Sequence, residues 1–152
     1  MGRRLSFFEI IARTFLLYVF SFLVLWGLYY AYWGRHLYLV TAYCNCPICI
    51  NVKKYHDGRF ASNKRVYWGG IAADPEIPFG SRVELMPHWP QDWGTVMTLL
   101  KGRRKFTVED RGGKIKGKHI DLFIPDSLGG HQAAKQWGVR RMRIKINGNW
   151  VE

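Results

Sequence analysis

The chain has 152 residues, enough for one ordinary domain and too few for a second catalytic domain. Its 23 lysine and arginine residues against 11 acidic residues give a formal net charge of +12. This excess favours a polyanionic partner such as nucleic acid, an acidic lipid surface or an acidic glycan, and charge alone does not choose among them.

A run of twenty residues without a charged side chain, 14–33, is long enough to cross a hydrocarbon core of roughly 30 Å as a helix. We therefore predict a transmembrane signal anchor there. Basic residues before it favour a cytoplasmic N-terminus, 1–13, with the remainder of the chain translocated. A cleaved signal peptide is the competing interpretation, but the apolar run is longer than a usual signal core. A linker, 34–39, and one domain, 40–152, would follow.

The remainder contains short apolar runs broken by Gly, Pro, Asn and Asp, and several alternate with period two, which predicts strands. The predicted strands are 37–43, 66–73, 82–86, 95–100, 105–109, 119–124 and 142–146. Only one helix is predicted in this part, around His131–Trp137, with Gly138 at its end. The stretch 87–94 is predicted as a surface loop. Six or seven short strands in so few residues indicate an all-β fold, a small closed barrel.

Three phrases each place an aspartate at the edge of an apolar strand or turn, and these residues are Asp74, Asp110 and Asp121. A carboxylate inside an apolar strand must be hydrogen-bonded, exposed at a rim or functional, since burial of a bare charge costs several kcal/mol. Asp74 and Asp110 could instead be turn-forming residues. Asp121 could be a rim carboxylate paired with Lys118 or Arg111.

In this order the phrases resemble the three-aspartate, or 3D, domain, a double-psi β-barrel found in the membrane-bound lytic transglycosylase A family. The family pattern runs Ala-x-Asp-Pro, Ile-Pro-x-Gly and Asp-x-Gly-Gly-x-Ile-x-Gly-x-x-x-Asp, then a short helix ending in Trp-Gly. These elements fall here on 72–75, 77–80, 110–121 and 133–138. Three phrases in the correct order make the signal specific. The resemblance implies a six-stranded double-psi barrel over about 41–146 that acts as a peptidoglycan lytic transglycosylase.

The resemblance also implies that Asp121 is the catalytic residue and that Asp110 and Asp74 line the same site. Asp121 would protonate the oxygen between N-acetylmuramic acid and N-acetylglucosamine, then take a proton from the muramic 6-hydroxyl as a 1,6-anhydro ring closes. No water is added, so a second carboxylate to position it is not required. A pKa raised by the apolar strand and by neighbouring carboxylates would suit such an acid.

Further substrate-binding candidates surround these aspartates. His119 lies two residues from Asp121 and shares its strand face, so it could tune that residue or contact sugar, or simply be a satisfied surface histidine. Trp89 and Trp93, in the predicted loop, could stack on sugar rings. The remaining candidates come from the glycine-rich phrase and are Gly112, Gly113 and Lys116. Departures from the family pattern at Arg111 and Lys114 bear on the substrate more than on the reaction.

Cys44, Cys46 and Cys49 form a Cys-x-Cys-x-x-Cys cluster at the end of the first predicted strand. In an exported domain, one disulfide and one leftover thiol are the plain expectation. A zinc site that uses the three cysteines with His56 is the weaker alternative, because no second cysteine pair completes it. We therefore predict no cofactor and no resident metal.

The predicted partners are peptidoglycan glycan strands and, through the N-terminal helix, a membrane. Nucleic acid is not predicted, because the sequence lacks a recognisable motif or a basic helix with interleaved aromatics. The apolar run and the basic residues before it, together with the resemblance, predict a single-pass protein of a bacterial membrane with its domain on the extracytoplasmic side. Expansins share the barrel, so the alternative function is a non-catalytic module that binds peptidoglycan or loosens the wall.

Overall fold

The computed structural model describes residues 7–34, 36–50 and 57–151, and the chain divides into two compact units between His36 and Leu37. The first unit is one helix, α1 (Phe7–Gly34), of 28 residues. Every side chain from Phe7 to Tyr32 is exposed, and the helix is long and apolar enough to cross a membrane by length and composition, criteria that a signal sequence also meets. The helix predicted at 14–33 lies within α1.

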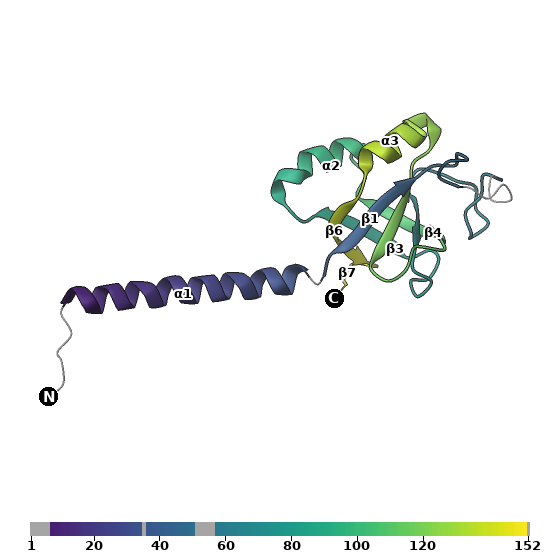
Figure 1. The fold of residues 1–152 in the computed structure, drawn as a ribbon. Helices are drawn as coiled ribbons and strands as arrows, with labels where there is room; N and C mark the ends of the chain where they lie inside the picture. The colour runs from purple at the N-terminus through teal and green to yellow at the C-terminus, as the bar shows by residue number, and fades with distance from the viewer. Residues whose placement is uncertain (1–6, 35, 51–56, 152) are drawn as a thin grey trace. The chain divides into compact units, whose positions relative to one another are not determined.

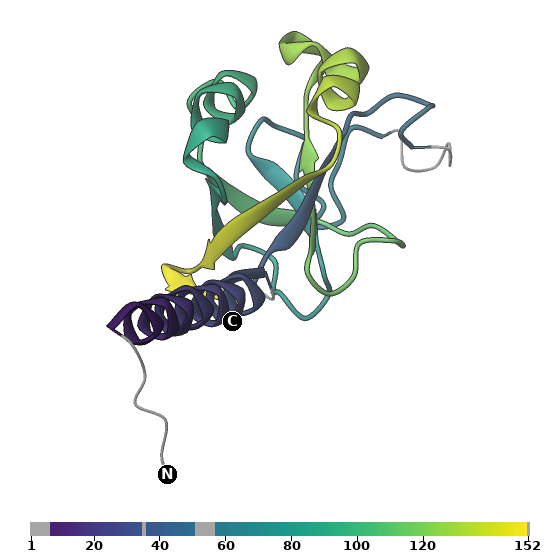
Figure 2. The ribbon, with the colours of Figure 1, turned by 60° about the vertical axis from the view of Figure 1, so that its left-hand side comes forward.

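The second unit is a closed β-barrel (Figures 1 and 2). Hydrogen-bonded neighbours follow the order β1–β5–β2–β4–β3–β6, and β6 pairs back with β1 to close the ring. Its strands are β1 (Tyr38–Tyr43), β2 (Gly70–Ala73), β3 (Arg82–Pro87), β4 (Lys105–Asp110), β5 (His119–Phe123) and β6 (Arg140–Ile146). A short β7 (Asn149–Trp150) pairs with β6. The pairs β1–β5 and β2–β4 are parallel, and the others are antiparallel. This barrel confirms the predicted fold class.

Alternation of side chains explains most of the strands. In β6, Met142 and Ile144 are buried in the core, whereas Arg141 is exposed and Arg143 is half-buried. β2 is buried on both faces, which its small residues allow.

Two glycines shape the start of β2. A side chain at Gly70 would collide with the Phe60 ring, so this glycine lets the segment after residue 57 pack onto the barrel. β2 begins later than predicted because Gly69, with φ of 122°, breaks the strand before it.

The prediction of a single helix after the anchor is wrong, and so is the strand predicted at 95–100. The structure has α2 (Trp93–Leu99) as well as α3 (Gly130–Trp137), and one-turn 3₁₀ helices at Pro90–Asp92 and Asp126–Leu128. Val96 and Leu100, four residues apart, are both buried, which is helical spacing. A short apolar run does not distinguish strand from helix by itself. Both views place α2 and α3 at the same end of the barrel (Figures 1 and 2).

Trp137 anchors α3 to the barrel. Its side chain is 2% exposed, and its indole N–H donates to the Val40 carbonyl oxygen at 3.0 Å. The bond ties the end of α3 to the middle of β1, so the two elements hold each other in place.

We expect Trp137→Phe to lower the free energy of unfolding by about 2 kcal/mol, because it removes this hydrogen bond and leaves a small void. The measurement is a urea titration of the full chain in mild detergent, followed by near-ultraviolet circular dichroism. Trp150→Phe is the matched control: Trp150 is 45% exposed, and the change should stay within about 0.5 kcal/mol. Equal effects of the two substitutions would contradict the anchoring role.

Candidate functional site

A cavity of about 790 Å³ lies beside the barrel strands that carry two of the three predicted aspartates. Asp110 and Asp121 both line it, together with Tyr43 and Arg111. The consecutive glycines predicted to bind substrate, Gly112 and Gly113, line it as well. A cavity of this size falls in the range of ligand-binding pockets.

Asp121 is half-buried on β5, directly opposite Thr41 of the parallel strand β1. The Thr41 hydroxyl donates to Asp121 Oδ1 at 2.7 Å and lies 2.9 Å from His119 Nε2. Because a hydroxyl has one proton, a Thr41 that donates to Asp121 must accept from the His119 N–H. The structure therefore connects His119 with Asp121 through a threonine.

The pKa of Asp121 is raised above its usual range, chiefly because burial disfavours the charged form. The hydrogen bond from Thr41 and the charge of His119 act in the opposite direction, and the nearby Asp110 carboxylate raises the pKa further. Burial outweighs the single hydrogen bond. Asp121 is thus a carboxyl group that keeps its proton to a higher pH than an ordinary aspartate.

Asp110 ends β4 and accepts three hydrogen bonds. The backbone N–H groups of Ala61 and Arg111 donate to Oδ1, each at 2.9 Å, and the Tyr43 hydroxyl donates to Oδ2. Burial, and then the charge of Asp110, raise the pKa of Tyr43 well above its usual range, so this phenol stays a neutral donor. Asp110 is held by two other segments of the chain, at Tyr43 and Ala61, and by the N–H of the next residue.

Asp74 is not among the residues that line this cavity. Its Oδ1 accepts from the Glu76 N–H at 2.8 Å and its Oδ2 from the Gly117 N–H at 2.6 Å. These backbone donors lower the pKa of Asp74 below its usual range. The carboxylate therefore joins two turns, one after β2 and one before β5.

Arg111, a departure from the family pattern, connects the glycine-rich turn with the turn after β2. Its guanidinium donates to the Ile77 carbonyl oxygen at 2.6 Å and lies 4.0 Å from the centre of the Phe79 ring. A side chain at the next residue, Gly112, would come within 2.6 Å of Ile115 Cγ1, so only glycine fits there without displacement. These contacts fix the backbone beside the cavity.

The remaining substrate-binding candidates lie away from this cavity. Trp89 lines a separate cavity of about 260 Å³, and the Trp93 ring packs under the Arg104 guanidinium, with 5.7 Å between the guanidinium carbon and the ring centre. Lys116 is exposed to solvent. None of the three is among the residues that line the 790 Å³ cavity.

Sequence reasoning missed three groups that hold the aspartates. Thr41 and Tyr43 are two residues apart on β1, so they share a strand face, and this spacing is a signal that the sequence does contain. Ala61 contributes only its backbone N–H, from a segment 49 residues away from Asp110, and no sequence pattern marks it.

Among the described residues, one group of side chains has the composition of a metal site: Cys44, Cys46, Cys49 and His131. The histidine predicted to join the cysteines, His56, lies outside the described residues. The three cysteines are free thiols. Desolvation raises the pKa of Cys46, but the Cys44 thiol and the N–H groups of Cys49 and Ile48 outweigh it and lower that pKa to about 6.

Comparison with known proteins gives one family and a few relatives. The model of the 3D domain family matches residues 69–147. The cell wall-binding protein YocH of Bacillus subtilis (strain 168) is 34% identical over 77 residues, which are 50% of this chain and 20% of YocH. This chain thus corresponds to a small part of that relative.

Among solved structures, the chain is similar to MltA from Escherichia coli, at 25% identity and a TM-score of 0.40, over 58% of this chain and 26% of MltA. The structure of MltA with bound chitohexaose gives 21% identity and a TM-score of 0.40 over the same shares. These TM-scores are too low for any role of an MltA residue to be transferred to this chain.

The raised pKa of Asp121 predicts how stability depends on pH. An unfolded aspartate titrates near pH 3.9, and the folded state holds the proton of Asp121 to a higher pH. The contribution of Asp121 to stability is therefore present at low pH and is lost as the pH rises through the folded-state pKa. Each unit of pKa difference corresponds to about 1.4 kcal/mol.

Asp121→Asn, which carries no titrating proton, should gain stability relative to the wild type as the pH rises from about 4 to 7. Thermal unfolding of both chains across this range measures the difference. Asp126→Asn, at an exposed position, controls for the change in net charge. A difference between Asp121→Asn and wild type that stays constant with pH would refute the raised pKa.

Proposed function

Because the chain belongs to the 3D domain family, we propose that it is a peptidoglycan lytic transglycosylase that acts in cell-wall turnover. It cleaves the β-1,4 bond between N-acetylmuramic acid and N-acetylglucosamine and leaves 1,6-anhydromuramic ends. The observation that carries this proposal is Asp121, a half-buried carboxyl group with a raised pKa on the wall of a cavity of about 790 Å³.

In the first step Asp121 acts as a general acid. Because its pKa is raised, Asp121 stays protonated up to a pH closer to neutrality, and an acid catalyst needs this proton. Thr41 holds Oδ1, so we assign the proton transfer to Oδ2. The proton goes to the glycosidic oxygen, the bond to the anomeric carbon breaks, and the N-acetylglucosamine side leaves as an alcohol.

In the second step the same residue acts as a base. Asp121, now a carboxylate, takes the proton of the muramic 6-hydroxyl while that oxygen bonds to the anomeric carbon. The proton returns to Asp121, and no water is consumed. The Asp110 carboxylate, held by Tyr43 and Ala61 on the same cavity, places negative charge beside the positive charge that develops at the anomeric carbon.

Three further residues have supporting roles in this proposal. Gly112 and Gly113 leave room for a sugar beside the aspartates, because they line the cavity without side chains. We assign Asp74 a positioning role: it holds the turn whose Ile77 carbonyl binds Arg111, and Arg111 lines the cavity.

The helix and the charge support the location that we propose. α1 anchors the chain in a bacterial membrane with its N-terminus in the cytoplasm, and the barrel acts on the extracytoplasmic side. A net charge of +12 suits peptidoglycan, which carries lactyl and peptide carboxylates. The relative YocH is named a cell wall-binding protein, and this supports a wall partner.

That name also supports a second candidate function, a module that binds glycan strands without cleaving them. The same cavity would then hold a sugar chain, and Asp121 would accept hydrogen bonds from its hydroxyl groups. The two functions differ in their products, so analysis of the products separates them.

We expect the full chain, incubated with purified peptidoglycan, to release fragments that end in 1,6-anhydromuramic acid. Asp121→Asn should lower the release by at least about a hundredfold, because a general acid contributes that much or more. Mass spectrometry of the soluble fragments measures both the amount and the type of end.

Asp126→Asn is the matched control, since it removes an exposed carboxylate outside the cavity and should release fragments at the wild-type rate. Reducing ends in place of anhydro ends would show hydrolysis. Wall binding without any release would establish the non-catalytic module and exclude the enzyme.

A further inference from the structure

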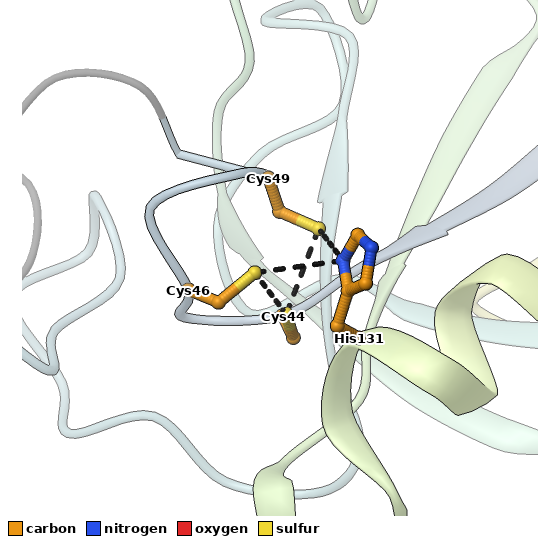
Figure 3. Close-up of side chains that lie close together, drawn as sticks. All are labelled: Cys44, Cys46, Cys49 and His131. Atoms are coloured by element: carbon orange, nitrogen blue, oxygen red, sulfur yellow. Dashed lines mark hydrogen bonds between the residues drawn. The ribbon is translucent and has the colours of Figure 1, made fainter.

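The cluster of Cys44, Cys46, Cys49 and His131 is not used by the proposed reaction, and its geometry points to a metal. The three cysteines follow β1, while His131 comes from α3, more than 80 residues later in the chain. Their three sulfur atoms and a histidine ring nitrogen all lie within 4.8 Å of one another. Figure 3 shows the four side chains converging on one point between the loop and the helix.

We propose that these four side chains bind one Zn²⁺ ion in a closed tetrahedral site. With Zn–S bonds of about 2.3 Å and a Zn–N bond of about 2.0 Å, the edges of the tetrahedron measure roughly 3.8 Å for S···S and roughly 3.5 Å for S···N. The Cys44–Cys49 sulfur distance is 3.6 Å. His131 Nδ1 lies 3.6 Å from Cys46 Sγ and 3.5 Å from Cys49 Sγ. Three of the six edges therefore already have the length that zinc requires.

The remaining measured edge needs a small adjustment. The sulfur atoms of Cys44 and Cys46 are 2.8 Å apart, so binding of an ion by both would increase this distance by roughly 1 Å. A disulfide would instead bring two of the sulfurs to about 2.05 Å and leave one thiol over. It would also leave unexplained why His131 Nδ1 contacts the sulfur atoms of both Cys46 and Cys49. A metal ion uses all four groups at once.

The ligand types select the ion. Three thiolates and one imidazole are soft or borderline ligands, which suit zinc and exclude magnesium and calcium. Four protein ligands fill the tetrahedron, so the ion has no open position for water or substrate. The site is therefore structural, and it adds no metal-bound nucleophile to the reaction at Asp121.

The local backbone holds the ligands at this spacing. The N–H groups of Cys49 and Ile50 both donate to the Cys46 carbonyl oxygen, at 3.1 and 2.9 Å, and so form a tight turn between the second and third cysteines.

The fourth ligand, His131, is the second residue of α3 and follows Gly129 and Gly130, both of which have positive φ. A side chain at Gly130 would collide with Asp126, so the turn that starts the helix is constrained as well.

The ion would connect the cysteine loop, which reaches the proposed active site, with α3. Cys49 and Ile50 line the cavity of Asp121, and Cys44 directly follows Tyr43, whose hydroxyl binds Asp110. α3 is fixed to β1 by Trp137. Zinc between the loop and α3 thus ties one wall of the cavity to the barrel.

The test begins with the metal content of the full chain, purified without a histidine tag and without chelator. Elemental analysis by mass spectrometry should find one zinc per chain. Replacement of zinc by Co²⁺ should give the intense visible absorption of a tetrahedral thiolate complex. Neither measurement depends on enzymatic activity, so failure of the proposed reaction would leave the result intact.

Variants identify the ligands. Cys46→Ser, Cys49→Ser and His131→Ala should each lose zinc during dialysis against a weak chelator that the wild type withstands. Gln132→Ala is the matched control, because Gln132 is exposed on the same turn of α3 and should keep the ion. Addition of a strong chelator should lower the melting temperature of the wild type and have a smaller effect on His131→Ala.

Two outcomes would overturn the proposal. The first is a wild-type chain that is purified without zinc and stays zinc-free after reduction and incubation with Zn²⁺. In that case, alkylation of the chain without reductant, followed by mass spectrometry, would show whether two of the cysteines form a disulfide. The second is zinc held equally well by the wild type and by all three ligand variants, which would indicate adventitious binding elsewhere.

Discussion

The parallel pairing of β1 with β5 is the constraint on which the Asp121 site depends, and the cysteine cluster begins directly after the same strand β1. Its register places Val40 opposite Ile120 and Thr41 opposite Asp121, across 80 residues of sequence. Side chains alternate along a strand, so the register that buries Val40 and Ile120 in the core also brings Thr41 and Asp121 together on the other face. A slip of one residue would turn the carboxylate into the core. β1 also pairs with β6, and this closure of the barrel opposes such a slip.

The aspartates of the family pattern differ in how the cost of desolvation is balanced. Asp74 accepts two backbone N–H bonds at the surface, and these outweigh desolvation, so its pKa falls. Asp121 receives a hydrogen bond from Thr41 and lies near Asp110, and burial dominates, so its pKa rises. Carboxyl groups whose environments push their pKa values apart are suited to different roles. The pattern of aspartates is therefore a mixture of structural anchors and a proton-transfer candidate.

The sequence predicted the barrel well because alternation and turn residues are local signals, as in β6. It failed for α2, where Val96 and Leu100 belong to an apolar run too short to show its period. The aspartates of the cavity were predicted through the family pattern. The groups that hold these aspartates were not all predicted, because the backbone N–H of Ala61 has no side-chain signature in the sequence. His131 was not predicted as the histidine beside the cysteines, because only the packing of α3 against β1 brings it near them.

The loop after β1 shows why this barrel benefits from a metal. Cys44 is buried, but Pro47 and Ile48 are exposed, so this stretch has little apolar area with which to fix its own position. Yet its two ends must be placed accurately, since Tyr43 binds Asp110 and Ile50 lines the same cavity. Four bonds to one ion supply the missing constraint, because a site that forms only in the folded chain adds its binding free energy to folding. Unlike a disulfide, which would use two of the cysteines, the ion also fixes the loop to α3 through His131.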